Sequence, residues 1–275
     1  MPPSSMVCPN CRTLISTEES RCPHCGTYRP GLWGLGPALT RVFGSQIDVL
    51  ALIPTACIAL FALSLMLDIR SALNTRGGLF GMLRPGQSAL YVLGMTGGDA
   101  IRAGHWWTVV TATYLHGGLL HILFNVLWIR QLGPEVGRLY GPARYFIIFT
   151  LAGAIGFLLS NAVGRAPTIG ASGAIFGLFA ALIVYGRWHG GSMMSMMTRQ
   201  GWQWAILLFI LGFFMSRVNN LAHLGGFIGG WIASRLLVSG TVRGEGRAAI
   251  LVALALLAFT ALAFGLSIFH NRALL

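Results

Sequence analysis

The chain has 275 residues, of which 55% are hydrophobic and only 9% are charged. A soluble domain normally carries about 25% charged residues, so this composition excludes an ordinary water-soluble fold and indicates a membrane protein. The net charge is +12, and all nineteen basic residues are arginine. The arginines stand singly between apolar runs, which argues against nucleic-acid binding, because that function needs clustered positive charge.

The first 30 residues are polar and contain two Cys-x-x-Cys pairs. The four cysteines are Cys8, Cys11, Cys22 and Cys25. Four thiolates suit tetrahedral zinc, and metal would have to drive the folding of so short a segment. The alternatives are a redox pair or a flexible tail, and His24 could compete as a ligand. We predict a head at 1–30 that resembles a zinc ribbon and holds structural zinc. Its partner cannot be read from the sequence.

No cleavable secretory signal precedes the first apolar run, which begins near Ile47. We therefore expect the head to stay on the side of synthesis, where reducing conditions keep cysteines out of disulfides. The Gly-rich residues 31–46 are expected to form a linker. Cys57 falls within an apolar run and is expected to be a packing residue.

Seven apolar runs then follow, and each is long enough, or nearly so, to cross the bilayer as a helix of ~20 residues. They cover roughly residues 47–67, 112–132, 143–162, 171–187, 202–216, 220–238 and 248–269. The fourth and fifth are short, and polar Gln203 interrupts the fifth early. We predict an all-α polytopic membrane protein, with six helices in a core at 47–240 and a seventh within 241–275.

The positions of the arginines predict the orientation. With the N-terminus in the cytoplasm, the short cytoplasmic connections carry Arg130, Arg138, Arg144, Arg187, Arg199, Arg235, Arg243 and Arg247. The short outer segments carry only Arg165, Arg217 and Arg272. This excess follows the positive-inside rule. We predict a multi-pass protein of the plasma or inner membrane with its C-terminus outside.

The connection 68–111 is unusually long. Four of its apolar residues could dip into the membrane interface: Leu79, Phe80, Met82 and Leu83. Trp106 and Trp107 are typical interfacial anchors. The alternative is an ordinary loop with amphipathic segments.

Polar side chains at membrane depth are costly and are usually functional. In the predicted topology the second, fourth and sixth spans enter from the outer face, and each has polar residues near its beginning. These residues are His116, His121, Asn125, Ser172 and His223. We expect them to lie at similar depth, a few turns below the outer surface.

Ser172 lies in the segment Gly-Ala-Ser-Gly, between Gly170 and Gly173. Small flanking residues allow a substrate backbone to approach the hydroxyl, and N–H groups at a helix start can stabilise an oxyanion. Alone, such a serine is more often a helix cap or a packing residue. It gains meaning only from its partners.

His223 is followed by Gly225 and Gly226. A neutral imidazole can accept the serine proton and later protonate the leaving amine. The glycines would let this helix press against the helix of Ser172. The alternative is a buried histidine bonded to a carbonyl. The only acid in the predicted core after Asp99 is Glu135, at the other end of a span, so the pattern favours a Ser–His dyad.

His121 and Asn125 are four residues apart, on one helix face. Both can donate hydrogen bonds to an oxyanion, although helix-to-helix hydrogen bonding is the alternative.

We assign His116 a structural role, holding the first loop or binding water. An intramembrane metal site at the three histidines lacks a carboxylate partner and the His-Glu-x-x-His spacing.

These residues together resemble the rhomboid family of intramembrane serine proteases. The matching segments are Gly170-Ala171-Ser172-Gly173 with Phe176 and Gly177, His116 with His121-Ile-Leu-Phe-Asn125, Ala222-His223-Leu-Gly-Gly226, Glu135-Val-Gly137 with Tyr140-Gly141, and Trp106-Trp107. The likeness spans roughly residues 48–240, and the combined motifs are specific.

The resemblance implies a six-helix core, with catalytic Ser172 and His223 on its fourth and sixth helices and no cofactor for catalysis. It implies an oxyanion hole from His121, Asn125 and the backbone of Ser172, and an aromatic, Phe176, packed under the catalytic histidine. It also implies substrates that are transmembrane segments of other proteins, cut near small residues.

One position departs from the family pattern. The first-loop signature usually continues Trp-Arg, whereas Thr108 follows Trp107 here, which puts the anchoring ion pair of that loop in doubt.

Two other functions remain open. A catalytically silent rhomboid-like protein would bind transmembrane clients, but this chain keeps both Ser172 and His223. A transporter would use the histidines as a proton relay and would place polar groups at mid-depth or on both sides.

Overall fold

The computed structural model describes residues 5–8, 11–16, 19, 21–26, 49–73, 83–164, 166–215, 218–238 and 246–274. The predicted linker 31–46 lies outside the described residues, as do Leu79, Phe80 and Met82 of the first loop and three of the arginines used to predict orientation, Arg165, Arg217 and Arg243. The predicted domain limits therefore stay a prediction.

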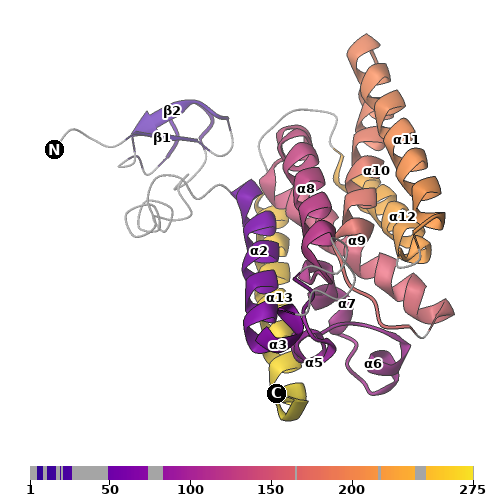
Figure 1. Cartoon of the computed structure of the whole chain (residues 1–275). Coiled ribbons are helices and arrows are strands. Elements are labelled where there is room, and N and C mark those ends of the chain that lie inside the picture. The colour runs from indigo at the N-terminus through magenta and orange to yellow at the C-terminus, as the bar shows by residue number, and fades with distance from the viewer. Residues whose placement is uncertain are drawn as a thin grey trace.

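The head contains two short antiparallel strands, β1 (Ser5–Val7) and β2 (Leu14–Ser16), with Met6 opposite Ile15. Most of the rest of the described chain is helical (Figure 1). Its long helices are α2 (Val49–Leu67), α8 (Leu119–Tyr140), α9 (Pro142–Val163), α10 (Ser172–His189), α11 (Ser192–Phe213), α12 (Asn220–Leu237) and α13 (Arg247–Asn271). The first loop carries the short helices α3 (Ile69–Ala72), α5 (Gln87–Val92), α6 (Gly98–Arg102) and α7 (Thr108–Thr111), and the turn η1 (Ala112–Tyr114). A last turn, η2, covers Arg272–Leu274.

The helices confirm an all-α polytopic membrane fold. Within the described residues, α2, α9 and α13 are each long and apolar enough to cross a bilayer. A fourth span is formed if α7 and η1 are joined to α8, across a bend of 92°. Helices α10, α11 and α12 are less apolar. Helices α10 and α12 pack against each other and against α9, and α11 packs mainly against α10.

Helix α10 is the centre of the bundle. It contacts α8, α9, α11 and α12, and its residues from Gly173 to Gly186 are all buried. Large apolar side chains of α9 and α10 fill the core, including Tyr145, Phe149, Leu178, Phe179 and Ile183. The helix that begins at Ser172 is therefore surrounded by protein on every side along most of its length.

Two predicted spans have different limits from those read in the sequence. The second was expected at 112–132, but α8 begins at Leu119 and continues to Tyr140. The chain turns sharply before it, where Leu115 is extended and Gly118 precedes the helix. The fifth was expected at 202–216, but α11 begins at Ser192, and Gln203 lies within it without interrupting it. A single polar side chain does not break the backbone hydrogen bonds of a helix.

Candidate active site

Glycines bring α10 and α12 into backbone contact. A Cβ atom on Gly226 would lie 2.0 Å from the carbonyl oxygen of Gly173, and one on Gly230 would lie 2.2 Å from the Cα of Gly177. No side chain fits at either crossing, so the two helices approach more closely than any larger residue would allow. The structure thus shows the close approach of these helices that their glycines predicted.

This contact places Ser172 beside His223. Ser172 is the first residue of α10, and His223 lies in the first turn of α12. The hydroxyl Oγ of Ser172 and Nε2 of His223 are 2.9 Å apart, which is hydrogen-bond distance. His223 is only 6% exposed, so the pair is largely withdrawn from the surface.

An aromatic ring orients the imidazole. The rings of Phe176 and His223 are stacked, with centroids 4.4 Å apart and planes inclined by 16°. Nδ1 of His223 is buried and has no hydrogen-bond partner among the described residues. The arrangement therefore has a serine, a histidine and an aromatic support, and within the described residues it has no orienting carboxylate.

His121 and Asn125 lie in the first two turns of α8, and His116 lies in the turn before that helix. The backbone N–H of Gly117 donates to Nδ1 of His121 at 3.3 Å. In the neutral ring this assigns the remaining proton to Nε2, which is free to donate. Asn125 is buried, and its Nδ2 donates to the carbonyl of His121 at 2.8 Å, which uses one of its two N–H groups.

Gly170 brings His121 close to the serine loop. A Cβ at Gly170 would lie 2.6 Å from Nε2 of His121, and its φ of +124° is one that other residues rarely adopt. Nε2 of His121 thus lies against the backbone two residues before Ser172. The N–H of Gly170 donates to the carbonyl of Ala112 at 2.9 Å, which ties this loop to η1.

His116 is the most buried of His116, His121 and His223. Its side chain is completely buried, its Nδ1 is 3.2 Å from the carbonyl oxygen of Tyr114, and its ring meets that of His121 edge to face. The structural role predicted for His116 stays a prediction.

Glu135 lies well along α8 from His121. It pairs with Arg138 on the exposed surface of that helix.

The first loop is attached to α13. Nε1 of Trp107 donates to Ser267 at 3.0 Å, and the ring of Trp106 stacks on Phe259. Thr108, which stands where the family pattern has arginine, donates to the carbonyl of His105 at 2.7 Å and contacts the hydroxyl of Thr96 at 3.0 Å. Neutral hydrogen bonds therefore hold Thr108 within the first loop.

The sequence reasoning did not single out Asn219. Its Oδ1 accepts the N–H of Ala222 at 3.1 Å and so caps the helix that carries His223. An asparagine directly before an apolar helical run is a helix-start signal that was available in the sequence.

The four cysteines of the head form a second cluster. Their Sγ atoms all lie within 4.8 Å of one another, with Cys8–Cys25 at 3.7 Å and Cys11–Cys22 at 3.6 Å. A tetrahedral zinc with Zn–S bonds of about 2.3 Å would separate its sulfurs by about 3.8 Å. The cluster therefore has the spacing of a zinc site, and these cysteines could bind a metal.

The environment of Cys11 also favours the metal-binding form. A hydrogen bond to the Thr13 hydroxyl, with help from the Thr13 backbone, lowers the pKa of the Cys11 thiol below its usual value. The thiolate is the form that binds metal. The donor set and its chemistry both fit zinc.

Comparison with known proteins agrees with the geometry. The family model described as Rhomboid domain matches residues 103–240. Rhomboid protease GluP of Bacillus subtilis (strain 168) is 35% identical over 152 residues, which are 54% of this chain and 29% of that protein. YdcA of the same organism is 32% identical over 145 residues, 49% of this chain and 69% of that protein. RHOMBOID-like protein 5 of Arabidopsis thaliana is 29% identical over 167 residues, 57% of this chain and 52% of that protein.

The matched region contains α8 to α12, and with them Ser172 and His223. The chain spans less than a third of the length of GluP and about two thirds of that of YdcA. The family match and these identities lead to one conclusion: the chain belongs to the rhomboid family.

Proposed function

We propose that this protein is an intramembrane serine endopeptidase, with Ser172 as nucleophile and His223 as general base. The observation that carries the proposal is the 2.9 Å separation of Ser172 Oγ and His223 Nε2. The two side chains come from separate helices that are pressed together by glycines, and the stacked ring of Phe176 supports the imidazole. Family membership supports the same chemistry.

The reaction would be acyl transfer. As Oγ of Ser172 attacks the carbonyl carbon of the scissile peptide, Nε2 of His223 takes the hydroxyl proton. Collapse of the tetrahedral intermediate breaks the C–N bond, and the imidazolium gives its proton to the leaving amine. Water then attacks the ester with the same imidazole as base, which frees the new carboxyl group and restores the hydroxyl.

The oxyanion would be held by His121, Asn125 and the backbone N–H groups at the start of α10. Nδ1 of His121 accepts a hydrogen bond, which leaves its Nε2–H to donate, and Asn125 keeps one uncommitted N–H. The first N–H groups of a helix have no partner within it. Loss of one such donor typically costs about 10²–10³ in kcat.

We propose that the substrates are transmembrane segments of other membrane proteins, entering from the outer side of the bilayer. Ser172 starts α10, whereas Arg187 lies in its last turn. Arg138 and Arg235 likewise lie in the last turns of α8 and α12. By the positive-inside rule the arginine-bearing ends face the cytoplasm, so the dyad faces the other side. A substrate helix would have to unwind locally to offer a carbonyl, which small residues favour.

The test is cleavage of a transmembrane substrate in proteoliposomes, with labelling of Ser172 by a fluorophosphonate. Wild-type protein should cleave and be labelled, whereas Ser172→Ala and His223→Ala should do neither at a measurable rate. Ser195→Ala is the matched control, because that serine of α11 is exposed and donates a hydrogen bond to the carbonyl of Gly191, just before the helix. Cleavage that persists in both dyad variants would overturn the proposal, and an inactive wild type would favour a client-binding protein.

We also propose that the head holds one structural zinc ion on Cys8, Cys11, Cys22 and Cys25. Metal analysis of the full chain should find zinc in equal amount to protein, and Cys8→Ser with Cys22→Ser should abolish it. The head of the double variant should become sensitive to proteolysis, because the segment has too small a core to fold alone. Cys57→Ser is the control, since that residue is buried in α2. Zinc retained by the double variant would contradict the assignment.

A further inference from the structure

A set of hydroxyl and amide side chains, which the proposed chemistry does not use, joins four segments next to the dyad. The segments are the first loop, the end of α9, the loop that precedes α10, and the start of α12. The side chains are those of Thr96, Thr108, Ser160, Asn161, Thr168 and Asn219.

Asn219 lies at the junction of these segments. Its Nδ2 donates to Ser160 on α9 at 2.6 Å and to Thr168 at 3.2 Å, and its Oδ1 accepts the N–H of Ala222 at 3.1 Å. The carbonyl of Asn219 accepts the N–H of His223 itself, at 3.2 Å. One side chain therefore touches both the first turn of the histidine-bearing helix and, through Thr168, the loop that leads to Ser172 four residues later.

Thr96 extends the same cluster into the first loop. Its carbonyl accepts the N–H of Thr168 at 2.8 Å, and its hydroxyl accepts from Asn161 at 2.9 Å. Thr96 is fully buried and its hydroxyl contacts that of Thr108. The loop before Ser172 is thus bonded on one side to the first loop and on the other to Asn219.

From this arrangement we infer that Asn219 is a positioning residue, which fixes the Ser172 hydroxyl and the His223 imidazole at hydrogen-bond distance. The role rests on the proposed protease function. The glycines of α10 and α12 fix the separation of the helix axes, but they do not fix how the serine loop is placed against the first turn of α12. The hydrogen bonds of Asn219 supply that constraint, and a shift of about 1 Å in such a site can cost 10²-fold in rate.

The need for a helix cap does not by itself explain why residue 219 is asparagine. Serine caps a helix as well as asparagine does, but it is too short to reach Ser160 and Thr168 while capping. Aspartate keeps the length and the cap, and the two hydroxyls can turn to donate to its second oxygen. The variants Asn219→Ser and Asn219→Asp therefore separate the cap from the link between the two segments.

The experiment measures kcat, KM, the rate of fluorophosphonate labelling at Ser172, and the thermal midpoint for the full chain in detergent. Asn219→Ser and Thr168→Val should lower kcat and the labelling rate by about 10- to 100-fold, with KM and the midpoint little changed. Asn219→Asp should restore most of the rate. Asn271→Ser is the matched control: its Nδ2 donates to the Ser267 carbonyl at 2.9 Å, at the end of α13, and its removal should leave kcat unchanged.

The outcomes separate this inference from the proposed function. An active wild type with Asn219→Ser and Thr168→Val at wild-type kcat would overturn the positioning role alone. A loss of rate that only follows a lowered midpoint, and that Asn219→Asp does not restore, would reduce Asn219 to a structural cap. A wild type that neither cleaves nor is labelled would remove the protease function and this role with it.

Discussion

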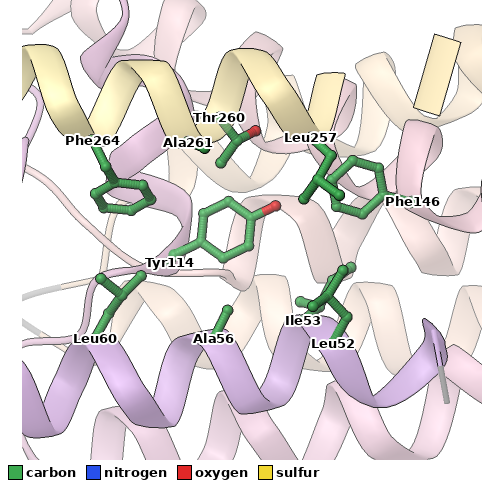
Figure 2. A pocket seen from close by; sticks show the side chains of 10 residues that line it. All are labelled: Leu52, Ile53, Ala56, Leu60, Tyr114, Phe146, Leu257, Thr260, Ala261 and Phe264. Carbon is green, nitrogen blue, oxygen red and sulfur yellow. The ribbon is translucent and has the colours of Figure 1, made fainter. Parts of the chain in front are cut away.

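Helices α10 and α12 meet through their backbones, whereas α2 and α13 face each other across a partly open pocket. At the first contact a Cβ on Gly226 would collide with the Gly173 carbonyl. At the second, side chains of α2 and α13 line a partly open pocket of about 190 Å³ beside Tyr114 and Phe146 (Figure 2). Figure 2 shows Tyr114 standing between the two helices.

The two helix pairs therefore differ in how closely they must pack. Where α10 and α12 cross at Gly226 and Gly230, there is no room for one more carbon atom. The distance between Ser172 and His223 depends on this close approach of the two helices. The region around α13 leaves volume unfilled and joins the first loop by single hydrogen bonds and ring contacts. We expect substitutions of the glycines at which α10 and α12 meet to lower both the rate and the stability, and substitutions around α13 to act mainly on stability.

The largest effect is expected from Gly226→Ala. The new methyl group would lie 2.0 Å from the Gly173 carbonyl oxygen, and because the obstacle is backbone, the helices must separate. Overpacking of this kind costs about 1–3 kcal/mol or more, and the shift at the dyad should lower cleavage by about 100-fold. Thermal unfolding and substrate cleavage measure the two effects.

Gly265→Ala on α13 is the matched control for that prediction, since a Cβ there would meet nothing within 4 Å. Alanine should raise helix stability by up to about 1 kcal/mol and leave cleavage unchanged. Equal losses in Gly226→Ala and Gly265→Ala would show that the two regions do not differ.

A smaller effect is expected from Ser267→Ala. This fully buried serine accepts the indole N–H of Trp107 at 3.0 Å, and its loss leaves that donor unpaired. The cost should be about 1–3 kcal/mol of stability, with the first loop more accessible to proteolysis. Thr260→Val should have little effect, because the Thr260 hydroxyl bonds within its own helix to the Leu256 carbonyl. A Ser267→Ala protein with an unchanged thermal midpoint would contradict the attachment of the loop to α13.

A gain is expected from Ala56→Val, which adds two methyl groups beside the cavity between α2 and α13. Filling such a space typically adds about 0.5–2 kcal/mol when the new side chain fits. The thermal midpoint should rise and cleavage should stay the same. Ala233→Val, at a buried position of α12, is the contrasting substitution and should lower the midpoint.

The smallest effect concerns pH. The side chain of Asp68 caps α3 by accepting the hydroxyl and the N–H of Ser71, and these hydrogen bonds lower the pKa of its carboxyl group. A depressed pKa means that the stabilisation is present above the ordinary carboxyl value and is lost as pH falls through the lowered one. The midpoint of wild type should fall more than that of Asp68→Asn on acidification. If the thermal midpoints of the two proteins fall in parallel as the pH is lowered, Asp68 does not contribute to stability in this way.

The sequence predicted much of the candidate site because bilayers penalise polar groups. Ser172 and His223 stood out as polar residues at the beginnings of two apolar runs, and the structure places them 2.9 Å apart. The same reasoning gave wrong limits for the second span, because hydropathy does not register the 92° bend before α8. It passed over Thr96 and Asn219, since small polar residues in loops are common and only their mutual distances single them out.

By itself, the sequence determined that the chain lies in a membrane, which side chains could react, and that a cysteine cluster precedes the helices. These follow from composition and spacing, which are local properties of the chain. Only the tertiary structure decided that glycines of α10 and α12 meet backbone to backbone, that α13 holds the first loop through Ser267, and that Asn219 reaches Thr168. Each of these contacts joins residues far apart in the chain, and their distances depend on how whole helices pack.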